Sequence, residues 1–216
     1  MEVLDAILSR RSIRKYMDVP VEREKIGRIL EAGKAAPSAG NIQNWKFLLI
    51  EQADKRQKIA EACLQQWWMA KAASIIIIVT EPDKVRQFYG IRGERLYSVQ
   101  NAAAAAMCML LQAHELGLGS CWVGAFDEAK LKTLCSIPDQ ARPQIVLTIG
   151  YPDENPPPPP EFGMEEVMFF RDFGGQPNRI EDIPFYQGMF SERVDKAINA
   201  TKGFIKKLGT PKEKKK

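Results

Sequence analysis

The chain has 216 residues, of which 45% are hydrophobic and 27% charged, as in an ordinary globular protein. This composition excludes a wholly disordered chain, a collagen-like repeat and a disulfide scaffold, and the length favours one substantial core. The net charge of +4 is local, because residues 202–216 carry seven lysines and one acid, which leaves residues 1–201 at about −2. Nucleic-acid binding is therefore not supported. The lysine-rich end is either a solvated terminus or a weak contact for anionic surfaces.

Several other classes of protein are also disfavoured. The longest apolar stretches, around residues 72–79 and 102–111, are too short to cross a bilayer. The first residues include acidic Glu2 and Asp5 and show no basic segment followed by an apolar one. No secretory signal is therefore expected, and the protein is predicted to be cytoplasmic. The four cysteines form no CxxC pair and His114 is the sole histidine, so we expect neither a metal site nor a Ser-His-Asp triad. Any redox chemistry would then need an organic cofactor.

Helices and strands alternate through the first half of the chain. Apolar residues at helical spacing predict a first helix over residues 2–9, which ends in a strongly basic turn. Breaker residues around Gly40 predict a loop. The other elements expected here are a helix over 21–35, a strand over 45–50, a helix over 53–66, and a strand over 73–80 that is buried on both faces.

The second half begins with the longest predicted helix, residues 94–117, whose alanines at 102–106 let neighbouring segments approach closely. The elements that follow are a strand over 120–123, a helix from the capping residue Asp127 through Leu134, and a strand over 144–149. Five prolines at 156–160 form an extended segment, either a linker or an arm that lies on another subunit. A final amphipathic helix is expected over 191–208. Because the order lacks a regular βαβ rhythm, the predicted class is α+β with one sheet.

The first candidate site is the basic segment Arg10-Arg11-Ser12-Ile13-Arg14. Three guanidinium groups and a hydroxyl within one short segment suit a phosphate, because the arginine fork binds phosphate bidentately and a dianion needs more than one cation. The alternative is a solvated basic turn that holds no ligand.

Two further segments offer groups to a flat ligand. The loop Pro37-Ser38-Ala39-Gly40-Asn41 and the amides after it present donors and acceptors that match a flavin or pyrimidine edge, although an ordinary turn would look the same. The glycine-lined segment 117–126 follows a helix, so it fits a Rossmann dinucleotide site poorly. Its backbone N–H groups still suit contact with a ligand atom.

Taken in this order, the segments resemble the nitroreductase-like family of FMN-dependent oxidoreductases. The matching pieces are RRSIRKY at 10–16, APSAGNIQNW at 36–45, SIIIIV at 74–79, AHELGLGSCWVGAF at 113–126 and IGYPDENPPPPP at 149–160. The resemblance implies a nitroreductase-like FMN-binding domain over residues 1–170 and a C-terminal extension over 171–216 that wraps the partner subunit. It also implies a central mixed or antiparallel sheet, flanked by helices, in an intertwined homodimer.

The same resemblance implies roles for individual residues. Arg10, Arg11, Ser12 and Arg14 would hold the FMN phosphate and pyrimidine edge, and a backbone N–H near Gly124 would face the flavin N5. The other implied contacts are Pro37, Ser38, Ala39 and Asn41 from a loop of the second subunit, Gln65 against the ring, and Val123 and Ala125 beside Gly124. NAD(P)H would be the electron donor, a nitroaromatic or quinone the planar acceptor, and no acid or base residue is strictly needed.

Some positions depart from the family pattern or have two interpretations. Glu161 and Phe162 stand where relatives carry a basic residue, so either the three arginines suffice, another cation substitutes, or FMN binds more weakly. Asn101 replaces a usual acid and is interpreted as structural. Trp67 and Trp68 either pack in the core or an interface, which we favour, or stack on the acceptor.

Two other functions stay open at this point. One is a specialised member of the family, such as a reductive dehalogenase or a flavin-fragmenting enzyme, for which residues 87–94 are the candidate lid. The other is a flavin-binding protein that senses redox state without turnover. Turnover with NAD(P)H and a quinone would exclude this non-catalytic protein.

Overall fold

The computed structural model describes residues 1–175, apart from the side chains of Met164 and Glu165. One unit spans Met1–Pro158, and a second begins at Pro159 and contains the short helix α7 (Met164–Val167). The helix expected over 191–208, and the part of the expected extension beyond residue 175, lie outside the described residues.

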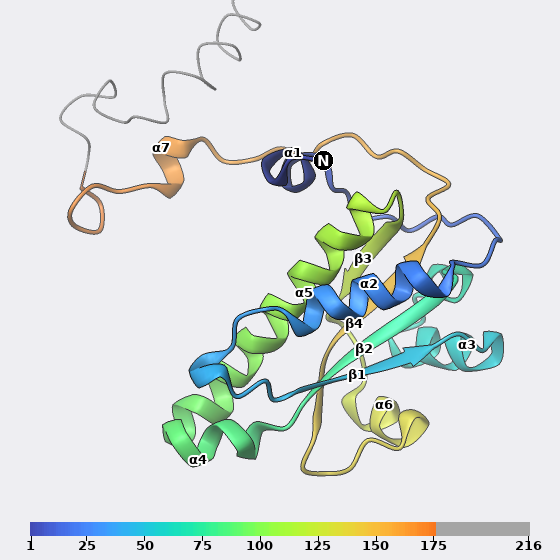
Figure 1. The fold of residues 1–216 in the computed structure, drawn as a ribbon, viewed down its shortest axis with the longest axis horizontal. Helices are drawn as coiled ribbons and strands as arrows, with labels where there is room; N and C mark the ends of the chain where they lie inside the picture. Colours follow the sequence, from blue (N-terminus) through green and yellow to red (C-terminus); the bar gives the residue numbers. More distant parts are fainter. Residues whose placement is uncertain (176–216) are drawn as a thin grey trace, which may run out of the picture. The chain divides into compact units, whose positions relative to one another are not determined.

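A four-stranded antiparallel sheet forms the centre of the first unit (Figure 1). Its strands, in spatial order, are β1 (Trp45–Ile50), β2 (Ser74–Thr80), β4 (Arg142–Gly150) and β3 (Gly119–Val123). Trp45 pairs with Thr80, and Ile149 lies between Ser74 on one side and Ser120 on the other. This arrangement confirms the predicted α+β class, and β1 has the predicted bounds.

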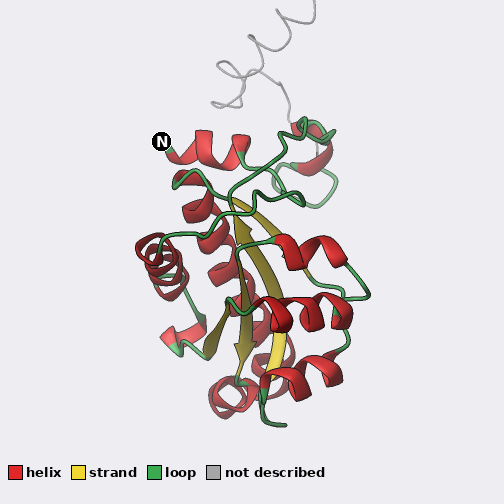
Figure 2. Cartoon of the chain, turned by 90° about the vertical axis from the view of Figure 1, so that its right-hand side faces the viewer, coloured by secondary structure: helices red, strands yellow, loops and turns green. Residues whose placement is uncertain are grey.

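Helices cover both faces of the sheet, as Figure 2 shows from the side. The alternation of side chains along β2 explains why. Ile76 and Ile78 pack into a core cluster with helices α2 (Arg23–Lys34) and α5 (Ser98–Glu115), while Ile75 and Ile77 pack with α3 (Ala53–Ala62) and α6 (Glu128–Cys135). Every residue of β2 is buried, as its β-branched run predicts.

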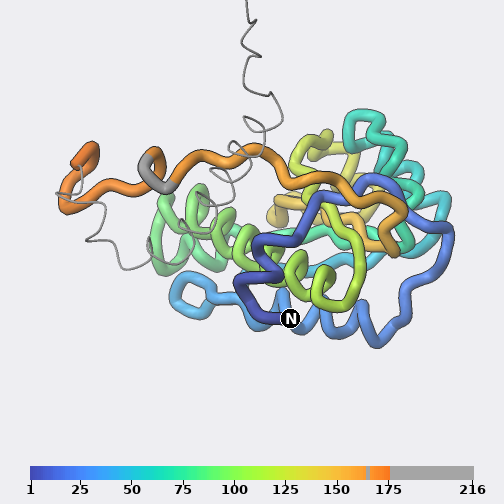
Figure 3. Tube along the Cα trace, turned by 90° about the horizontal axis from the view of Figure 1, so that it is seen from above, coloured from blue at the N-terminus to red at the C-terminus, as the bar shows by residue number. Residues whose placement is uncertain are grey.

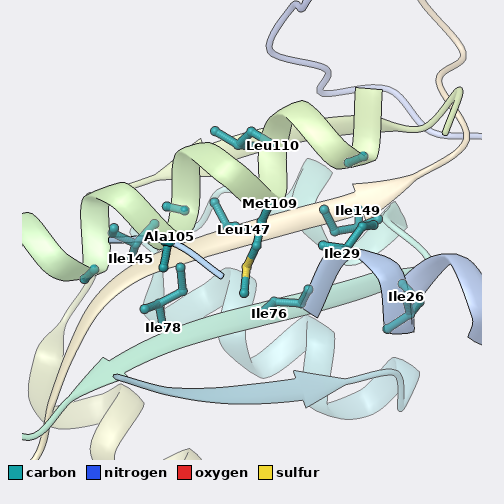
Figure 4. Packing of buried hydrophobic residues seen from close by; sticks show 14 of the residues in the cluster. Ile26, Ile29, Ile76, Ile78, Ala105, Met109, Leu110, Ile145, Leu147 and Ile149 are labelled. Atoms are coloured by element: carbon teal, nitrogen blue, oxygen red, sulfur yellow. The ribbon is translucent and has the colours of Figure 1, made fainter. Parts of the chain in front are cut away.

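The long helix α5 lies at the centre of the first cluster, with Met109 between Leu147 and Ile76 (Figure 4). Its contact with α2 depends on a glycine. A Cβ added at Gly33 would lie 2.2 Å from Met109 Cε, so a larger residue would displace the Met109 side chain from this contact. The predicted central position of this helix is therefore confirmed.

The remaining helices differ from the sequence predictions in three places. Helix α3, which was expected over 53–66, ends at Ala62. Helix α4 (Pro82–Arg92) was not predicted, and a π-helical turn (Gly93–Tyr97) separates it from α5, so the helix expected over 94–117 begins later. The cap at Asp127 is confirmed, because its carboxylate accepts a 3.0 Å hydrogen bond from Lys130 N.

The short helix α1 (Val3–Ser9) lies beside the end of α5 (Figures 1 and 3). In the part of the chain that the structure describes, no helix is long and apolar enough to span a membrane. The same residues bring no three His, Cys, Asp or Glu side chains together as a metal site would require. All four cysteines are free thiols.

Candidate functional site

The basic segment after α1 extends the sheet along its β3 edge. Ser12 bridges Ser120 in parallel, and Ile13 N donates a 3.0 Å hydrogen bond to Ser120 O. Ile13 is buried directly against Gly119, where an added Cβ would lie 2.9 Å from Ile13 Cγ2. Gly119 therefore allows this segment to approach β3 closely and fixes the arginines on both sides of Ile13.

Two buried polar atoms at this edge have no hydrogen-bond partner among the described residues. They are Arg10 Nε and Ser120 Oγ. An unpaired buried donor costs about 1–3 kcal/mol, so a polar ligand that accepts hydrogen bonds from these atoms would be stabilised here. A guanidinium and a hydroxyl beside Ser12 are donors that suit a phosphate, so the residues present fit the phosphate of FMN.

The arginines of this segment differ in how their guanidinium groups are bound. Arg11 Nη1 donates to the carbonyl oxygens of Leu8 and Arg10, at 2.7 and 2.8 Å, so its guanidinium is turned back onto the chain. Arg14 is exposed, and its Cζ lies 5.9 Å from the centre of the Trp68 ring. Arg10 and Arg14 are therefore better placed for a ligand than Arg11.

A buried tyrosine fixes the end of this segment. Tyr16 Oη donates a 2.6 Å hydrogen bond to Ile13 O and lies 2.7 Å from Thr148 Oγ1 on β4. Burial raises the pKa of Tyr16 far above its ordinary value, so the phenol stays protonated. Burial also raises the pKa of the Cys121 thiol, although Arg14, Ser12 and Arg10 lower it in part.

His114 joins α1 to α5 near the same edge. Its Nε2 lies 2.7 Å from Ser9 Oγ, which itself donates to Asp5 O at 2.5 Å. Because a serine hydroxyl has one proton, His114 must donate through Nε2–H. Burial, and then the charges of Arg10 and Arg11, lower the pKa of His114. The histidine is thus hydrogen-bonded and structural, as expected.

The loop over 37–41 is held by a buried chain of amides. Ala39 N donates to Asn101 Oδ1 at 2.9 Å, Asn101 Nδ2 donates to Asn44 Oδ1 at 2.8 Å, and Asn44 Nδ2 donates to Ser98 Oγ at 2.8 Å. Ser98, Asn44 and Asn101 are almost fully buried. These bonds give Asn101 the structural role that the sequence suggested.

The outer side of this loop faces an open pocket of about 390 Å³. Its lining is Pro37, Ser38, Ala39, Tyr89, Tyr97, Gln100, Asn101 and Ala104. Gly40 has a φ of 57°, and an added Cβ there would lie 2.7 Å from Tyr89 Oη, so two separate constraints favour glycine at the turn. Asn41, at the next position, is exposed and also has a positive φ of 55°.

The two predicted halves of the site lie at opposite ends of α5. The loop contacts this helix at Asn101, whereas Ser9, the last residue of α1 and the neighbour of Arg10, contacts it at His114. Thirteen residues of helix separate these positions by about 20 Å. One chain therefore does not bring the arginine segment after α1 and the loop after α2 together. Figure 1 shows α1 and the loop that follows α2 near opposite ends of α5.

The third group of predicted residues lies where β3 ends. Val123 is buried, and Gly124 and Ala125 emerge from the strand exposed. Gln65 is exposed with a φ of 59°, but it is Gln66 whose Nε2 reaches Ala125 O, at 3.4 Å. The segment that carries Gln65 thus lies beside the predicted N5 contact, and the neighbouring glutamine makes the observed bond.

Sequence reasoning missed two residues of this site and only part of the role of a third. Ser120 and Glu154 were not singled out, and Trp68 was interpreted mainly as packing. Trp68 does pack against Ile13 and the second core cluster, as favoured, but it also lies under Arg14. Trp67 is half exposed. An acid 140 residues along the chain from Arg14 gives no local signal of its contact.

Comparison with known proteins shows a consistent set of relatives. Residues 7–73 and 65–151 match the family described as "Nitroreductase family". A protein of Methanothermobacter thermautotrophicus named "Putative NADH dehydrogenase/NAD(P)H nitroreductase" is 38% identical over 160 residues, which are 72% of this chain and 80% of the relative. "FMN reductase [NAD(P)H]" of Bacillus subtilis is 25% identical, over 92% of this chain and 85% of its own.

A solved structure gives the same result. The "FMN-dependent Nitroreductase" of Clostridium difficile is 27% identical and superposes with a TM-score of 0.69. The similarity covers 79% of this chain and 99% of that protein. The shared fold therefore extends over nearly all of that protein.

Proposed function

Because the chain belongs to the nitroreductase family, we propose that it passes electrons from NAD(P)H through bound FMN to a planar acceptor such as a nitroaromatic or a quinone. Relatives named FMN reductase and NADPH-flavin oxidoreductase support the flavin and the nicotinamide donor. The observation that carries the choice of FMN is the pair of unpaired buried donors, Arg10 Nε and Ser120 Oγ, beside Ser12. A phosphate would satisfy both.

In this proposal the residues along β3 bind and orient the cofactor. Arg10, Ser12 and Ser120 would hold the phosphate, and Arg14, whose guanidinium lies over Trp68, would contact the pyrimidine edge. When bound, FMN supplies reversible hydride transfer at its N5. A cation at the pyrimidine edge stabilises the negative charge that reduction adds, so Arg14 favours the reduced cofactor. The backbone near Gly124 and the Gln65 segment face the ring.

We further propose that the site is completed by a second copy of the chain. The loop over 37–41 lies about 20 Å along α5 from the arginine segment, so it can reach a cofactor only in a neighbouring subunit. Helix α1 supports this assembly. Four of its apolar side chains are exposed by 39–71%, namely Val3, Leu4, Ile7 and Leu8. A homodimer would bury them and bring the two halves together.

The experiment is a visible spectrum of the purified protein after FMN is added and unbound FMN is removed, repeated anaerobically with NADH or NADPH. We expect retained flavin bands that bleach with the nicotinamide. Arg10→Ala should release FMN, and Arg14→Ala should weaken its binding or lower its potential. Arg11→Ala is the matched control, because the Arg11 guanidinium binds chain carbonyls, and it should change both properties less.

Three outcomes would contradict parts of this proposal. Absence of retained flavin would reject FMN as the cofactor. Retained flavin that does not bleach would reject the nicotinamide reaction and favour a non-catalytic flavin protein. Full flavin occupancy and an unchanged potential in both Arg10→Ala and Arg14→Ala would reject the assignment of the arginine segment.

A further inference from the structure

We propose that Glu154 is a positioning residue, which binds the backbone of Arg14 and so fixes where the Arg14 side chain begins. Through Arg14, Glu154 sets how strongly the site favours reduced over oxidised FMN. The inference rests on the proposed function. Glu154 Oε1 accepts hydrogen bonds from two successive backbone N–H groups, those of Arg14 at 2.5 Å and Lys15 at 3.1 Å. Two adjacent backbone N–H groups therefore donate to a single carboxylate oxygen of the same chain.

Backbone pairing holds Glu154 in this place. Met17 N donates to Tyr151 O at 3.0 Å, Asp153 N donates to Lys15 O at 3.0 Å, and Tyr16 bridges Pro152 in antiparallel fashion. Residues 151–154 therefore run against 14–17 as a short ladder. The ladder places the carboxylate at the level of Arg14, so the contact follows from the fold and not from a chance rotamer.

The carboxylate binds the backbone of Arg14 and leaves its guanidinium available. Among the described residues the Glu154 carboxylate forms no ion pair with Arg14, whose guanidinium lies over Trp68. An acid paired with the guanidinium would cancel the cation that the site needs. An acid on the backbone orients that cation and keeps its charge.

The same carboxylate also carries a negative charge close to the proposed cofactor edge. Position and charge act in opposite directions on reduction, because the fixed Arg14 favours the reduced cofactor while the carboxylate charge opposes it. Two substitutions separate these contributions. Glu154→Gln keeps an oxygen that accepts both N–H bonds and removes the charge, whereas Glu154→Ala removes both.

The first measurement needs no cofactor. In the cofactor-free protein, amide hydrogen exchange at Arg14 and Lys15 should be several-fold faster in Glu154→Ala and close to wild type in Glu154→Gln. Asp153→Asn is the matched control, because it changes the same charge one residue earlier while no side-chain hydrogen bond of Asp153 is present among the described residues. Unchanged exchange in Glu154→Ala would overturn the anchoring role.

The second measurement is the affinity for oxidised FMN together with the flavin midpoint potential. We expect Glu154→Ala to weaken FMN binding by about tenfold. Glu154→Gln should bind oxidised FMN nearly as wild type does but should raise the potential, so that reduced FMN is favoured several-fold more, and Asp153→Asn should change each value less. A role in folding alone would not raise the potential.

The two proposals fail in different ways. If the wild-type protein retains no FMN while exchange changes as expected, the proposed function and the effect on the cofactor are wrong, and Glu154 is a structural anchor. If the wild-type protein binds FMN but Glu154→Gln leaves the potential unchanged, the proposed function stands and the role of Glu154 in setting that potential is rejected.

Discussion

The arginine segment over 10–14 and the loop over 37–41 are both assigned to one cofactor, yet they differ in their hydrogen bonds. Polar atoms at the arginine segment lack partners, whereas those that hold the loop are paired. Arg10 and, beside the segment, Ser120 have buried polar atoms without partners among the described residues. The loop is complete by itself, because Asn101 and Asn44 bond to Ala39 N, to each other and to Ser98. We interpret the unpaired polar atoms of the arginine segment as a place for a ligand. We interpret the loop, whose polar groups are paired, as a rigid surface that needs no ligand to order it.

In the proposed homodimer, this difference would let two copies of the chain contribute to one cofactor site in different ways. The segment along β3 supplies charge and unpaired donors, so it gains most when an anion binds. The loop supplies small side chains on a fixed backbone, so it can cover a flat ring without rearrangement.

The largest effect is expected in the loop. Asn101→Ala leaves Ala39 N and the Asn44 amide without their partner, which should lower the free energy of unfolding by about 2–4 kcal/mol. Asn101→Asp should cost much less, because the Asn44 amide can turn over and donate to the new carboxylate while Ser98 donates to Asn44. Urea unfolding of both variants tests this, and equal losses would show that the amide chain does not hold the loop.

The next effect is expected along β3. Gly119→Ala places a methyl group 2.9 Å from Ile13 Cγ2, so it should destabilise the protein by about 1–3 kcal/mol and reduce FMN retention. Gly27→Ala is the control, because Gly27 lies within α2 and an added Cβ there has no neighbour within 4 Å. It should stabilise the helix by about 0.5–1 kcal/mol. Thermal unfolding would contradict this account if Gly119→Ala and Gly27→Ala changed the stability of the protein in the same direction.

A smaller effect is expected at Tyr16. Tyr16→Phe keeps the buried ring but removes the hydroxyl that joins Ile13 O to Thr148, which should cost about 1 kcal/mol. The loss should appear as weaker FMN binding without a change in the loop, because the hydroxyl fixes only the arginine segment. Amide exchange at residues 13 and 39 distinguishes the two regions, and faster exchange at residue 39 would contradict their independence.

The smallest effect depends on pH. The pKa of His114 in the folded protein lies below its ordinary value of about 6.5. As the pH falls below that value, the imidazole of the unfolded chain is protonated first. The free energy of unfolding therefore decreases until the pH passes the pKa of His114 in the folded protein. His114→Gln should flatten stability between pH 7 and 5. Arg10→Ala should raise the His114 pKa, as NMR titration of the single imidazole can show, and an unchanged pKa would show that Arg10 does not face it.

The sequence predicted the regular elements well where burial follows a period. The bounds of β1 are the predicted ones, and the isoleucines of β2 are buried on both faces. Helix α4 was missed because Pro82 and Val85 are its buried residues, so no apolar stripe marks it. The helix expected from residue 94 was cut short by a π-helical turn, which leaves no mark on hydrophobic spacing.

For the candidate site, the sequence predicted the types of residue but not the contacts that they make. Arginines and small residues stand in recognisable segments, so Arg10 and Ala39 could be named from the sequence. Three contacts depend on backbone geometry that only the fold brings together. Arg11 turns back onto the chain, Glu154 binds the backbone of Arg14, and Gln66 makes the bond near Ala125. Short sequence motifs do not contain that information.

The most direct test of the account is a mixed dimer in which each subunit carries a different defect. One subunit has Arg10→Ala, which removes the phosphate contact, and the other has Ala39→Glu, which adds bulk and negative charge to the loop. Each variant alone should lose its flavin. If the sites lie between subunits, a mixed dimer purified through two tags has one site with both halves intact and should retain one FMN per dimer. If each site lies within one chain, every site carries a defect, and a mixed dimer without flavin would contradict the account.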